Sequence, residues 1–162
     1  MSDTHLPRGQ RRLPEACLER LRRADAILHA GDFSRVEVLR ELEALGPPVH
    51  AVQGNTDDDV LRAELPVRRV VELAGARVGM VHDAGPAPGR LERQRALFAR
   101  DAVSAVVFGH SHIPLRETSA DGAFAIFNPG SATDRRREPR HTMGEASIAA
   151  NGALRFDHVA LD

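Results

Sequence analysis

A chain of 162 residues with 42% apolar and 28% charged side chains is long enough for a sizeable core and too short for two full domains. We therefore expect one domain over residues 1–162. Its 22 basic residues, all arginine, are balanced by 23 acidic ones. The resulting net charge of −1 argues against a protein that coats a nucleic acid, which needs a surplus of positive charge.

The sequence also bears on the compartment. The single cysteine, Cys17, cannot form an internal disulfide, which fits a reducing compartment. No apolar run approaches the ~18 residues of a membrane-spanning helix, and the first residues do not resemble a signal peptide. We expect a soluble, cytoplasmic protein without a membrane partner.

Helical and strand-like patterns alternate over the first two thirds of the chain. Helices are predicted over residues 13–23, from Ser34 to Gly46, and over residues 91–98. Short apolar strands are predicted over residues 26–30, 49–52, 70–73, 78–81 and 105–108. Ser34 with Glu37 forms a capping box for the second helix, and Pro14 suits the first position of the first helix.

Three turns predict β-hairpins. Gly75 separates the strands over residues 70–73 and 78–81, and Asp121-Gly122 and Asn151-Gly152 are strong hairpin-turn dipeptides with strand-like flanks. Strands that alternate with helices first, followed by antiparallel strands, predict an α/β layered domain.

Four polar residues share one position relative to the predicted strands. Asp32, Asn55, His82 and His110 each come just past the C-terminal end of a short apolar strand. Because loops at the carboxyl ends of strands in an open α/β sheet converge on one crevice, we expect these four side chains to meet in space.

Three more residues, His112 and the pair Asp3 and His5, complete a set of seven candidate metal ligands. The set holds four imidazoles, two carboxylates and one amide oxygen, and it contains no sulfur. Such mixed nitrogen and oxygen donors suit Mn, Fe, Zn, Ni or Co better than Ca or Mg. Seven donors are too many for one tetrahedral ion, but they suit two ions that share a carboxylate.

The order of these residues resembles the calcineurin-like metallophosphoesterases, and most closely their small YfcE-type phosphodiesterase branch. The blocks that carry the resemblance are Asp3-Thr4-His5, Gly31-Asp32, Gly54-Asn55, His82, Gly109-His110-Ser111-His112 and Asn128-Pro129-Gly130-Ser131. An ordered signature that extends from Asp3 to about Phe156 is far more specific than any single block.

The resemblance implies a four-layer α/β/β/α sandwich and a metal-dependent phosphodiesterase with a dinuclear centre. By the resemblance, one ion is bound by Asp3, His5 and His112, the other by Asn55, His82 and His110, and Asp32 bridges the two. The implied cofactors are two divalent transition-metal ions, with Mn preferred and Ni, Zn or Fe as alternatives. A metal-bridging hydroxide would attack the phosphate ester, with Asp32, His110 and Asn55 as catalytic residues.

Two features depart from the family pattern. Only Met1 and Ser2 precede Asp3 where the family has a full apolar strand, so we expect either a start upstream or a truncated first strand. Thr56 stands where larger relatives carry a histidine thought to protonate the leaving group. Asp57 is nearby but would need a raised pKa to act as that acid, so no general acid is assigned.

Several other polar residues have both a structural and a functional interpretation. Asn128 and Ser131 are expected to line the crevice as substrate-binding groups, through side-chain or backbone donors. Arg135 opens a run of three arginines followed by Arg140. This run is interpreted either as a solvated loop or as a phosphate-steering patch at the rim of the site, because guanidinium groups bind phosphate bidentately.

The remaining candidates are given structural roles. His29 and His50 lie within apolar strands and are expected to pack or to support ligands. Cys17 is expected in the core, because it lies on the apolar face of the first predicted helix. The acidic run over residues 57–59 is interpreted as a solvated helix start.

Two other functions compete with the phosphodiesterase. The main alternative is a catalytically idle scaffold that acts through protein-protein contacts, because a retromer subunit related to this family keeps the fold but has lost a metal-binding histidine. A DNA-processing nuclease ranks last, since the chain has neither the size nor the charge. We expect a phosphorylated small-molecule substrate and no stable nucleic-acid complex, and exposed sheet edges leave a homo-oligomer open.

Overall fold

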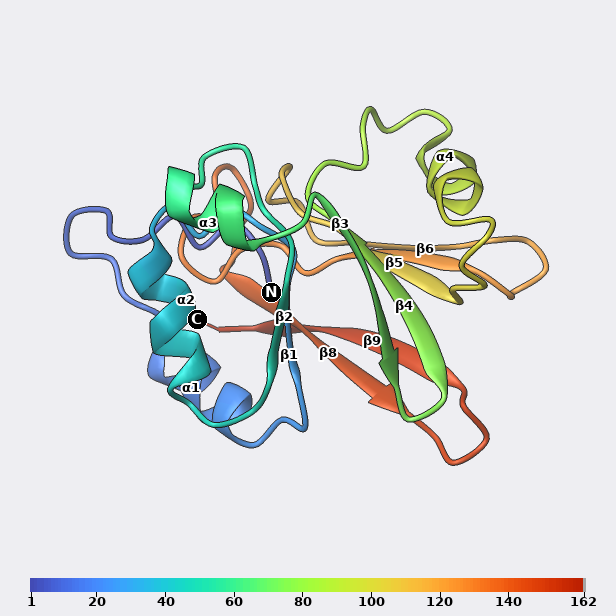
Figure 1. The fold of residues 1–162 in the computed structure, drawn as a ribbon, viewed down its shortest axis with the longest axis horizontal. Coiled ribbons are helices and arrows are strands. Elements are labelled where there is room, and N and C mark those ends of the chain that lie inside the picture. Colours follow the sequence, from blue (N-terminus) through green and yellow to red (C-terminus); the bar gives the residue numbers. More distant parts are fainter. Residues whose placement is uncertain (162) are drawn as a thin grey trace.

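A computed structural model describes residues 1–161 of the chain. These residues form the following helices and strands (Figure 1): α1 (Glu15–Arg22), β1 (Ile27–His29), α2 (Val36–Glu43), β2 (Val49–Ala51), α3 (Asp59–Glu64), β3 (Arg68–Leu73), β4 (Ala76–Val81), α4 (Arg90–Leu97), β5 (Ala105–Val107), β6 (Leu115–Thr118), β7 (Ala125–Asn128), β8 (Thr142–Ile148) and β9 (Leu154–Ala160). Among residues 1–161, no helix combines the length and the apolar character needed to cross a lipid bilayer.

The strands pair in three groups. A five-stranded sheet has the order β3-β4-β5-β7-β6, in which β4, β5 and β7 are parallel and the two edge strands are antiparallel to their neighbours. β1 pairs with β2 in parallel, and β8 pairs with β9 antiparallel. The three hairpins expected at the glycine-containing turns form as β3–β4, β6–β7 and β8–β9, so the α/β prediction is confirmed.

Three hydrophobic clusters show which of these elements pack against one another. Cys17 of α1 and Leu42 of α2 lie in one cluster with Ile27 of β1, so both helices cover the β1–β2 pair. A second cluster joins Phe156 of β9 to the five-stranded sheet, and a third packs Phe98, at the end of α4, against the opposite face of that sheet. The helices α1 and α2 thus lie on the side of the β1–β2 pair, and α4 lies on the far side of the five-stranded sheet (Figure 1).

The first residues of the chain run beside β1. The Met1 amino group donates to Leu28 O at 2.6 Å, and Ala30 N donates to Met1 O at 2.9 Å. Asp3 N then donates to Gly31 O at 3.0 Å. These bonds follow a parallel ladder, and they hold Asp3 in place although only a short segment precedes it.

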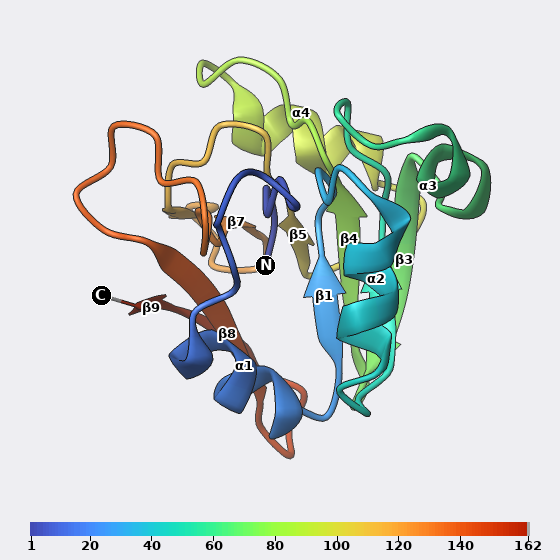
Figure 2. The same cartoon turned by 90° about the vertical axis from the view of Figure 1, so that its left-hand side faces the viewer.

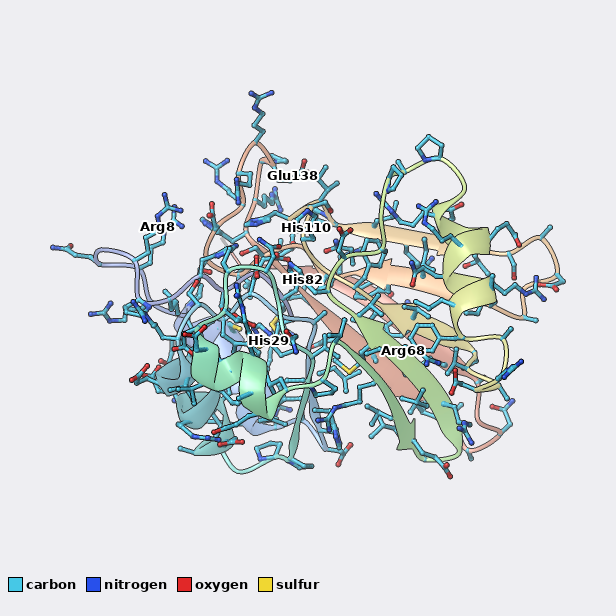
Figure 3. All side chains as sticks on the ribbon, turned by 45° about the horizontal axis from the view of Figure 1, so that its top comes forward. Arg8, His29, Arg68, His82, His110 and Glu138 are labelled. Atoms are coloured by element: carbon cyan, nitrogen blue, oxygen red, sulfur yellow. The ribbon has the colours of Figure 1, made fainter. Side chains whose placement is uncertain are left out.

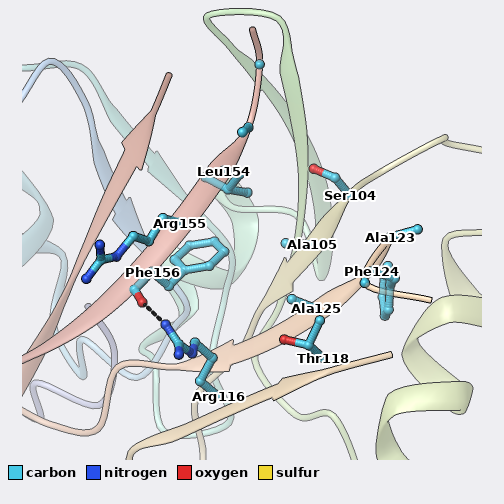
Figure 4. A pocket seen from close by; sticks show the side chains of 13 residues that line it. Ser104, Ala105, Arg116, Thr118, Ala123, Phe124, Ala125, Leu154, Arg155 and Phe156 are labelled. Carbon is cyan, nitrogen blue, oxygen red and sulfur yellow. Dashed lines mark hydrogen bonds between the residues drawn. The ribbon is translucent and has the colours of Figure 1, made fainter. Parts of the chain in front are cut away.

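Two hollows lie between the layers. The larger, of about 930 Å³, is bordered by Met1 and by parts of α1, β1 and β8. The smaller, of about 370 Å³, lies between β6, β7 and β9, where Arg116 Nη1 donates to Phe156 O at 2.8 Å (Figure 4). Neither hollow is lined by any of the seven candidate metal ligands, so the candidate site lies elsewhere.

The second helix begins differently from the prediction. Arg35 is the N-cap of α2, and Ser34 has a φ of +81°, so the predicted capping box with Glu37 is wrong. Val36 N donates instead to Asp58 Oδ2 at 3.1 Å, and Asp58 Oδ1 accepts from Leu61 N at 3.0 Å. One carboxylate from a distant loop therefore caps both α2 and α3, and the local signal is overridden.

The first helix confirms one expectation and corrects another. Cys17 is fully buried, and burial raises the pKa of its thiol to about 11. A thiol with a raised pKa holds little thiolate at neutral pH, as expected of a core residue. Pro14 is the N-cap of α1 and does not occupy its first helical position.

His29, at the end of β1, is a buried structural histidine. Its ring stacks on Phe33 with the centroids 3.6 Å apart, and its Nδ1 accepts from Gly31 N at 3.2 Å. Nε2 then carries the proton and faces Thr4 Oγ1 at 3.3 Å. Burial, the largest cause, holds the pKa of His29 well below its usual value.

We expect His29 to make the metal-free protein less stable in mild acid. Below about pH 6.5 the unfolded chain protonates this histidine while the folded protein does not, so its contribution falls by up to about 1.4 kcal/mol per pH unit. Urea unfolding between neutral pH and mild acid should therefore show a shallower loss in His29→Gln than in wild type. His158→Gln, at an exposed position of β9, is the control. Equal slopes in wild type and His29→Gln would contradict this assignment.

Candidate metal centre

The loops after β1, β2, β4 and β5 bring four predicted residues together. β1 and β4 point to the same edge of the molecule (Figure 2). At that edge His82 Nε2 lies 3.0 Å from Asn55 Oδ1 and 3.4 Å from Asp32 Oδ2. His110 Nδ1 lies 2.9 Å from Asn55 Oδ1. Figure 3 shows His82 and His110 close to each other, and the predicted convergence of the four strand ends is confirmed.

The other three predicted residues form an adjoining group. His5 Nε2 lies 3.2 Å from His112 Nε2, and His112 Nε2 lies 3.6 Å from Asp3 Oδ1. Asp32 Oδ2 is 3.5 Å from His5 Nε2 as well as close to His82. Asp32 thus lies between the two groups, while Asp3 belongs to both of the compact clusters of possible metal ligands found among residues 1–161.

The donor atoms fit metal ions. His82 Nδ1 donates to Ala30 O at 2.8 Å, so in the neutral imidazole Nε2 carries the lone pair that a cation would bind, beside the oxygens of Asn55 and Asp32. Asp3 Oδ2 is buried and has no hydrogen-bond partner among residues 1–161. Donor atoms that share one cation at ~2.1 Å lie roughly 3–3.5 Å apart, which is close to the separations in both groups. The arrangement therefore suits divalent cations.

Burial and mutual charge perturb the pKa values of the site. Burial, the largest cause, raises the pKa of Asp3 and lowers that of His5. Burial also acts to raise the pKa of Asp32, but its hydrogen bonds with His82 and with Thr56 N outweigh burial, and the net shift of the pKa is downward. Burial lowers the pKa of His82, yet Asp32 outweighs it and the net shift is upward. Asp32 therefore carries its negative charge at neutral pH, between the two donor groups.

The backbone at the donor residues adopts an uncommon conformation. Asp3, His5, Asp32, His110 and His112 all have φ values between 47° and 67°. This left-handed region costs a residue with a side chain about 1–2 kcal/mol. Such conformations cluster at functional sites, where the surrounding structure holds them. The repeated strain indicates that the loops are shaped to turn these side chains inward.

Asp57 fixes the loops that carry Asp32 and Asn55. Its Oδ1 accepts from Ser34 N at 2.9 Å and its Oδ2 accepts from Gly54 N at 2.7 Å. The side chain is buried, so the expectation of a solvated acidic run is wrong for this residue, although Asp58 does cap α3 as expected. Because main-chain amides occupy both oxygens, Asp57 holds the loops in place and is a poor candidate for the general acid.

We expect Asp57→Ala to lower the free energy of unfolding by about 2–4 kcal/mol, because it leaves two amides near the site without their charged acceptor. Asp59→Ala is the control, since Asp59 is an exposed residue of the same acidic run in the first turn of α3. Its loss should cost about 0.5 kcal/mol or less. Chemical denaturation measures both values, and equal losses in the two variants would contradict the role given to Asp57.

The calcineurin-like phosphoesterase superfamily domain matches residues 1–151. The chain belongs to this superfamily. A protein of Methanothermobacter thermautotrophicus, named a probable metallophosphoesterase, is 36% identical over 162 residues, which are 100% of this chain and 87% of that protein. A second probable metallophosphoesterase, from Methanocaldococcus jannaschii, is 32% identical over 134 residues, 82% of this chain and 66% of that protein.

The fold has solved counterparts. Wild-type Vps29 of Entamoeba histolytica, solved in complex with Zn²⁺, matches with a TM-score of 0.75 and 21% identity over 99% of this chain and 97% of that one. At this identity the likeness shows the fold alone. Together with the domain match it confirms the metallophosphoesterase fold that the ordered blocks predicted.

In this phosphoesterase two of the expected substrate-binding residues lie in the interior. Asn128 is completely buried, and its Nδ2 donates to Gly109 O at 2.8 Å. Ser131 Oγ donates to Asp3 O at 2.7 Å and is also buried. Both side chains therefore support the loops of the donor residues and do not line the crevice as expected.

In the run of arginines that begins at Arg135, the first two side chains have different surroundings. Arg135 bonds through its guanidinium to Glu138 O within its own loop. Its neighbour Arg136 reaches the site, with Nη2 3.3 Å from His112 Nε2. The sequence does not distinguish Arg136 from its two neighbours, because three consecutive arginines carry no signal for the direction of each side chain. Nor does it indicate Ser34, whose Oγ lies 3.5 Å from His5 Nδ1.

Proposed function

We propose that this phosphoesterase is a phosphodiesterase that works with two divalent transition-metal ions, with Mn preferred. The position of Asp32 carries the proposal. Its Oδ2 lies within 3.5 Å of His5 Nε2 in one donor group and within 3.4 Å of His82 Nε2 in the other. One carboxylate oxygen within reach of both groups is what two cations that share a ligand require.

Two bound divalent ions would supply a deprotonated water as the nucleophile and positive charge for the phosphoryl oxygens. The side chains of this protein position that chemistry. Thr56 N donates to Asp32 Oδ1 at 2.8 Å, and His110 N donates to Asp3 Oδ1 at 3.0 Å, so both carboxylates are oriented by main-chain amides. The substrate needs no covalent intermediate on the protein.

The exposure of the donor residues indicates where the substrate enters. Asp3, Asp32, His82 and His112 are buried, whereas Asn55 and His110 are exposed. A phosphate ester would therefore approach the centre past Asn55 and His110. This supports the proposal that these two residues act together with Asp32 as the catalytic residues.

Metal content and turnover test the proposal. Protein stripped with a chelator and reloaded with Mn²⁺ is expected to bind two ions per chain by mass spectrometry and to hydrolyse bis(p-nitrophenyl) phosphate. His110→Ala should lose nearly all turnover, whereas His50→Ala, on β2 outside the donor groups, should retain it. Absence of metal-dependent turnover in wild type, or equal turnover in His110→Ala, would overturn the proposal.

The alternative function is a scaffold that acts through protein contacts, and the likeness to Vps29 favours it at the level of the fold. A docking surface of that kind usually presents a continuous apolar patch. The exposed large apolar residues among residues 1–161 are Val60, Val67, Leu97 and Ile113. Val60 belongs to α3 and Leu97 to α4, which lie on opposite sides of the molecule in Figure 1, so these residues do not form one patch. The complete set of donor residues favours the enzyme.

A further inference from the structure

Two arginine-rich loops beside the donor groups are not used by the proposed chemistry. The segments over residues 7–12 and 134–140 contain seven arginines and two acidic residues, in a chain whose net charge is −1. Both segments lie outside the helices and strands. Positive charge is therefore concentrated in two loops.

Asp134 draws three of these arginines together. Its Oδ2 lies 3.2 Å from Arg11 Nη1, 3.6 Å from Arg8 Nη1 and 3.6 Å from Arg136 Nε. We call Arg8, Arg11 and Arg136 the arginine rim. Because one carboxylate faces three guanidinium groups, two positive charges of the arginine rim stay uncompensated at this contact.

Much of the hydrogen-bonding capacity of the arginine rim faces solvent. The side chains of Arg8, Arg11 and Arg136 are 67%, 37% and 60% exposed, whereas that of Asp134 is 8% exposed. Each guanidinium has five N–H donors in a planar fork. A single carboxylate oxygen cannot satisfy three such forks, so donors remain available to an oxyanion from outside.

The arginine rim adjoins the donor residues directly. Arg136 Nη2 lies 3.3 Å from His112 Nε2, and the main-chain carbonyl of Asp134 contacts His112 Nδ1. In Figure 3, the loop that carries Glu138 lies next to His110, while Arg8 lies farther to the left. A ligand held by these arginines would therefore be next to the proposed metal centre.

We propose that the arginine rim binds a second, uncleaved phosphate group of the substrate. The inference rests on the proposed function and narrows it to phosphate esters that carry an additional phosphate. Such a group has a charge of about −1.5 to −2 at neutral pH, which matches the two uncompensated charges of the arginine rim. Guanidinium forks bind phosphate oxygens bidentately, which gives geometric selectivity in addition to charge attraction.

Calorimetric titration of chelator-treated protein with inorganic pyrophosphate tests the site without metal. We expect wild type to bind pyrophosphate, and Arg136→Ala and the double variant Arg8→Ala/Arg11→Ala each to bind it about tenfold more weakly or worse. Arg136→Lys should lose less, because it keeps the charge but not the fork. Arg100→Ala, at an exposed position before β5, is the matched control and should bind like wild type. Thermal unfolding verifies that all variants fold.

Kinetics separates this inference from the proposed function. With Mn²⁺ in excess, the double variant Arg8→Ala/Arg11→Ala should hydrolyse bis(p-nitrophenyl) phosphate with nearly wild-type KM, while inhibition by pyrophosphate weakens. Two results would overturn the phosphate-binding role of the arginine rim even if turnover is normal. One is equal pyrophosphate affinity in the rim variants and in Arg100→Ala, and the other is no binding of pyrophosphate by wild type. Arginine-dependent binding of pyrophosphate by a protein without turnover would support the anion site and contradict the proposed phosphodiesterase activity.

Discussion

Asp32→Asn is expected to lower metal-dependent hydrolysis of bis(p-nitrophenyl) phosphate by about a thousandfold or more. The exchange preserves size, and the amide oxygen can still accept from Thr56 N, which lies 2.8 Å from Asp32 Oδ1. It removes the charge of the carboxylate that lies between His5 and His82. Loss of about 4 kcal/mol of transition-state stabilisation at a metal centre corresponds to that factor.

The same variant should also lose metal. We expect fewer than two ions per chain by mass spectrometry, and a smaller rise of Tm on adding Mn²⁺, because binding to the folded state alone is what raises stability. Asp83→Asn is the matched control: Asp83 is exposed, follows His82 directly and bonds only to Gly85 N among residues 1–161. Wild-type turnover in Asp32→Asn with full metal content would exclude Asp32 as the shared ligand.

The part of the site that could be predicted from sequence depends on topology. Short apolar strands are recognisable from composition, and in a parallel arrangement their carboxyl ends must face one edge. Asp32, Asn55 and His82 could therefore be placed together without knowledge of any contact, and the structure confirms this with separations of 3.0 to 3.4 Å. Their roles as ligands stay a prediction until metal content is measured.

Long-range contacts account for what could not be predicted. Ser34 and Glu37 satisfy the local rule for a capping box, but Asp58 from the loop after β2 binds the amide of Val36 and leaves Ser34 free to face His5. Likewise, Asn128 stands at the C-terminal end of β7, where a crevice residue could lie, yet its amide bonds to Gly109 O in the interior. Sequence spacing carries no information on which distant partner satisfies a polar group.

The arginine rim could not be predicted in full, because its members come from two loops that are far apart along the chain. Arg8 and Arg136 are 128 positions apart in the sequence, and the contact of both with Asp134 becomes evident only when the two loops are seen side by side. Periodicity detects helices and strands because they repeat. A loop such as residues 131–141 has no repeat, so its side-chain directions depend on the fold around it.

Gly54→Ala is expected to lower the free energy of unfolding by about 3 kcal/mol or more, at the upper end of the cost of overpacking. A Cβ atom at this position would lie 2.1 Å from both Asp32 N and Asp32 Oδ1, so one of the two loops must move. The bond from Gly54 N to Asp57 Oδ2, at 2.7 Å, opposes that movement. The proposed shared ligand would be displaced together with its backbone.

Two measurements distinguish this crowding from an ordinary glycine effect. Gly75→Ala is the control, since Gly75 has a φ of +83° in the β3–β4 turn and a Cβ there would meet nothing within 4 Å. Its cost should be the backbone strain alone, about 1–2 kcal/mol, with metal content unchanged. In Gly54→Ala, denaturation should show the larger loss and mass spectrometry a loss of metal. A variant that unfolds like Gly75→Ala and keeps its metal would show that Gly54 is not required for the close approach of the two loops.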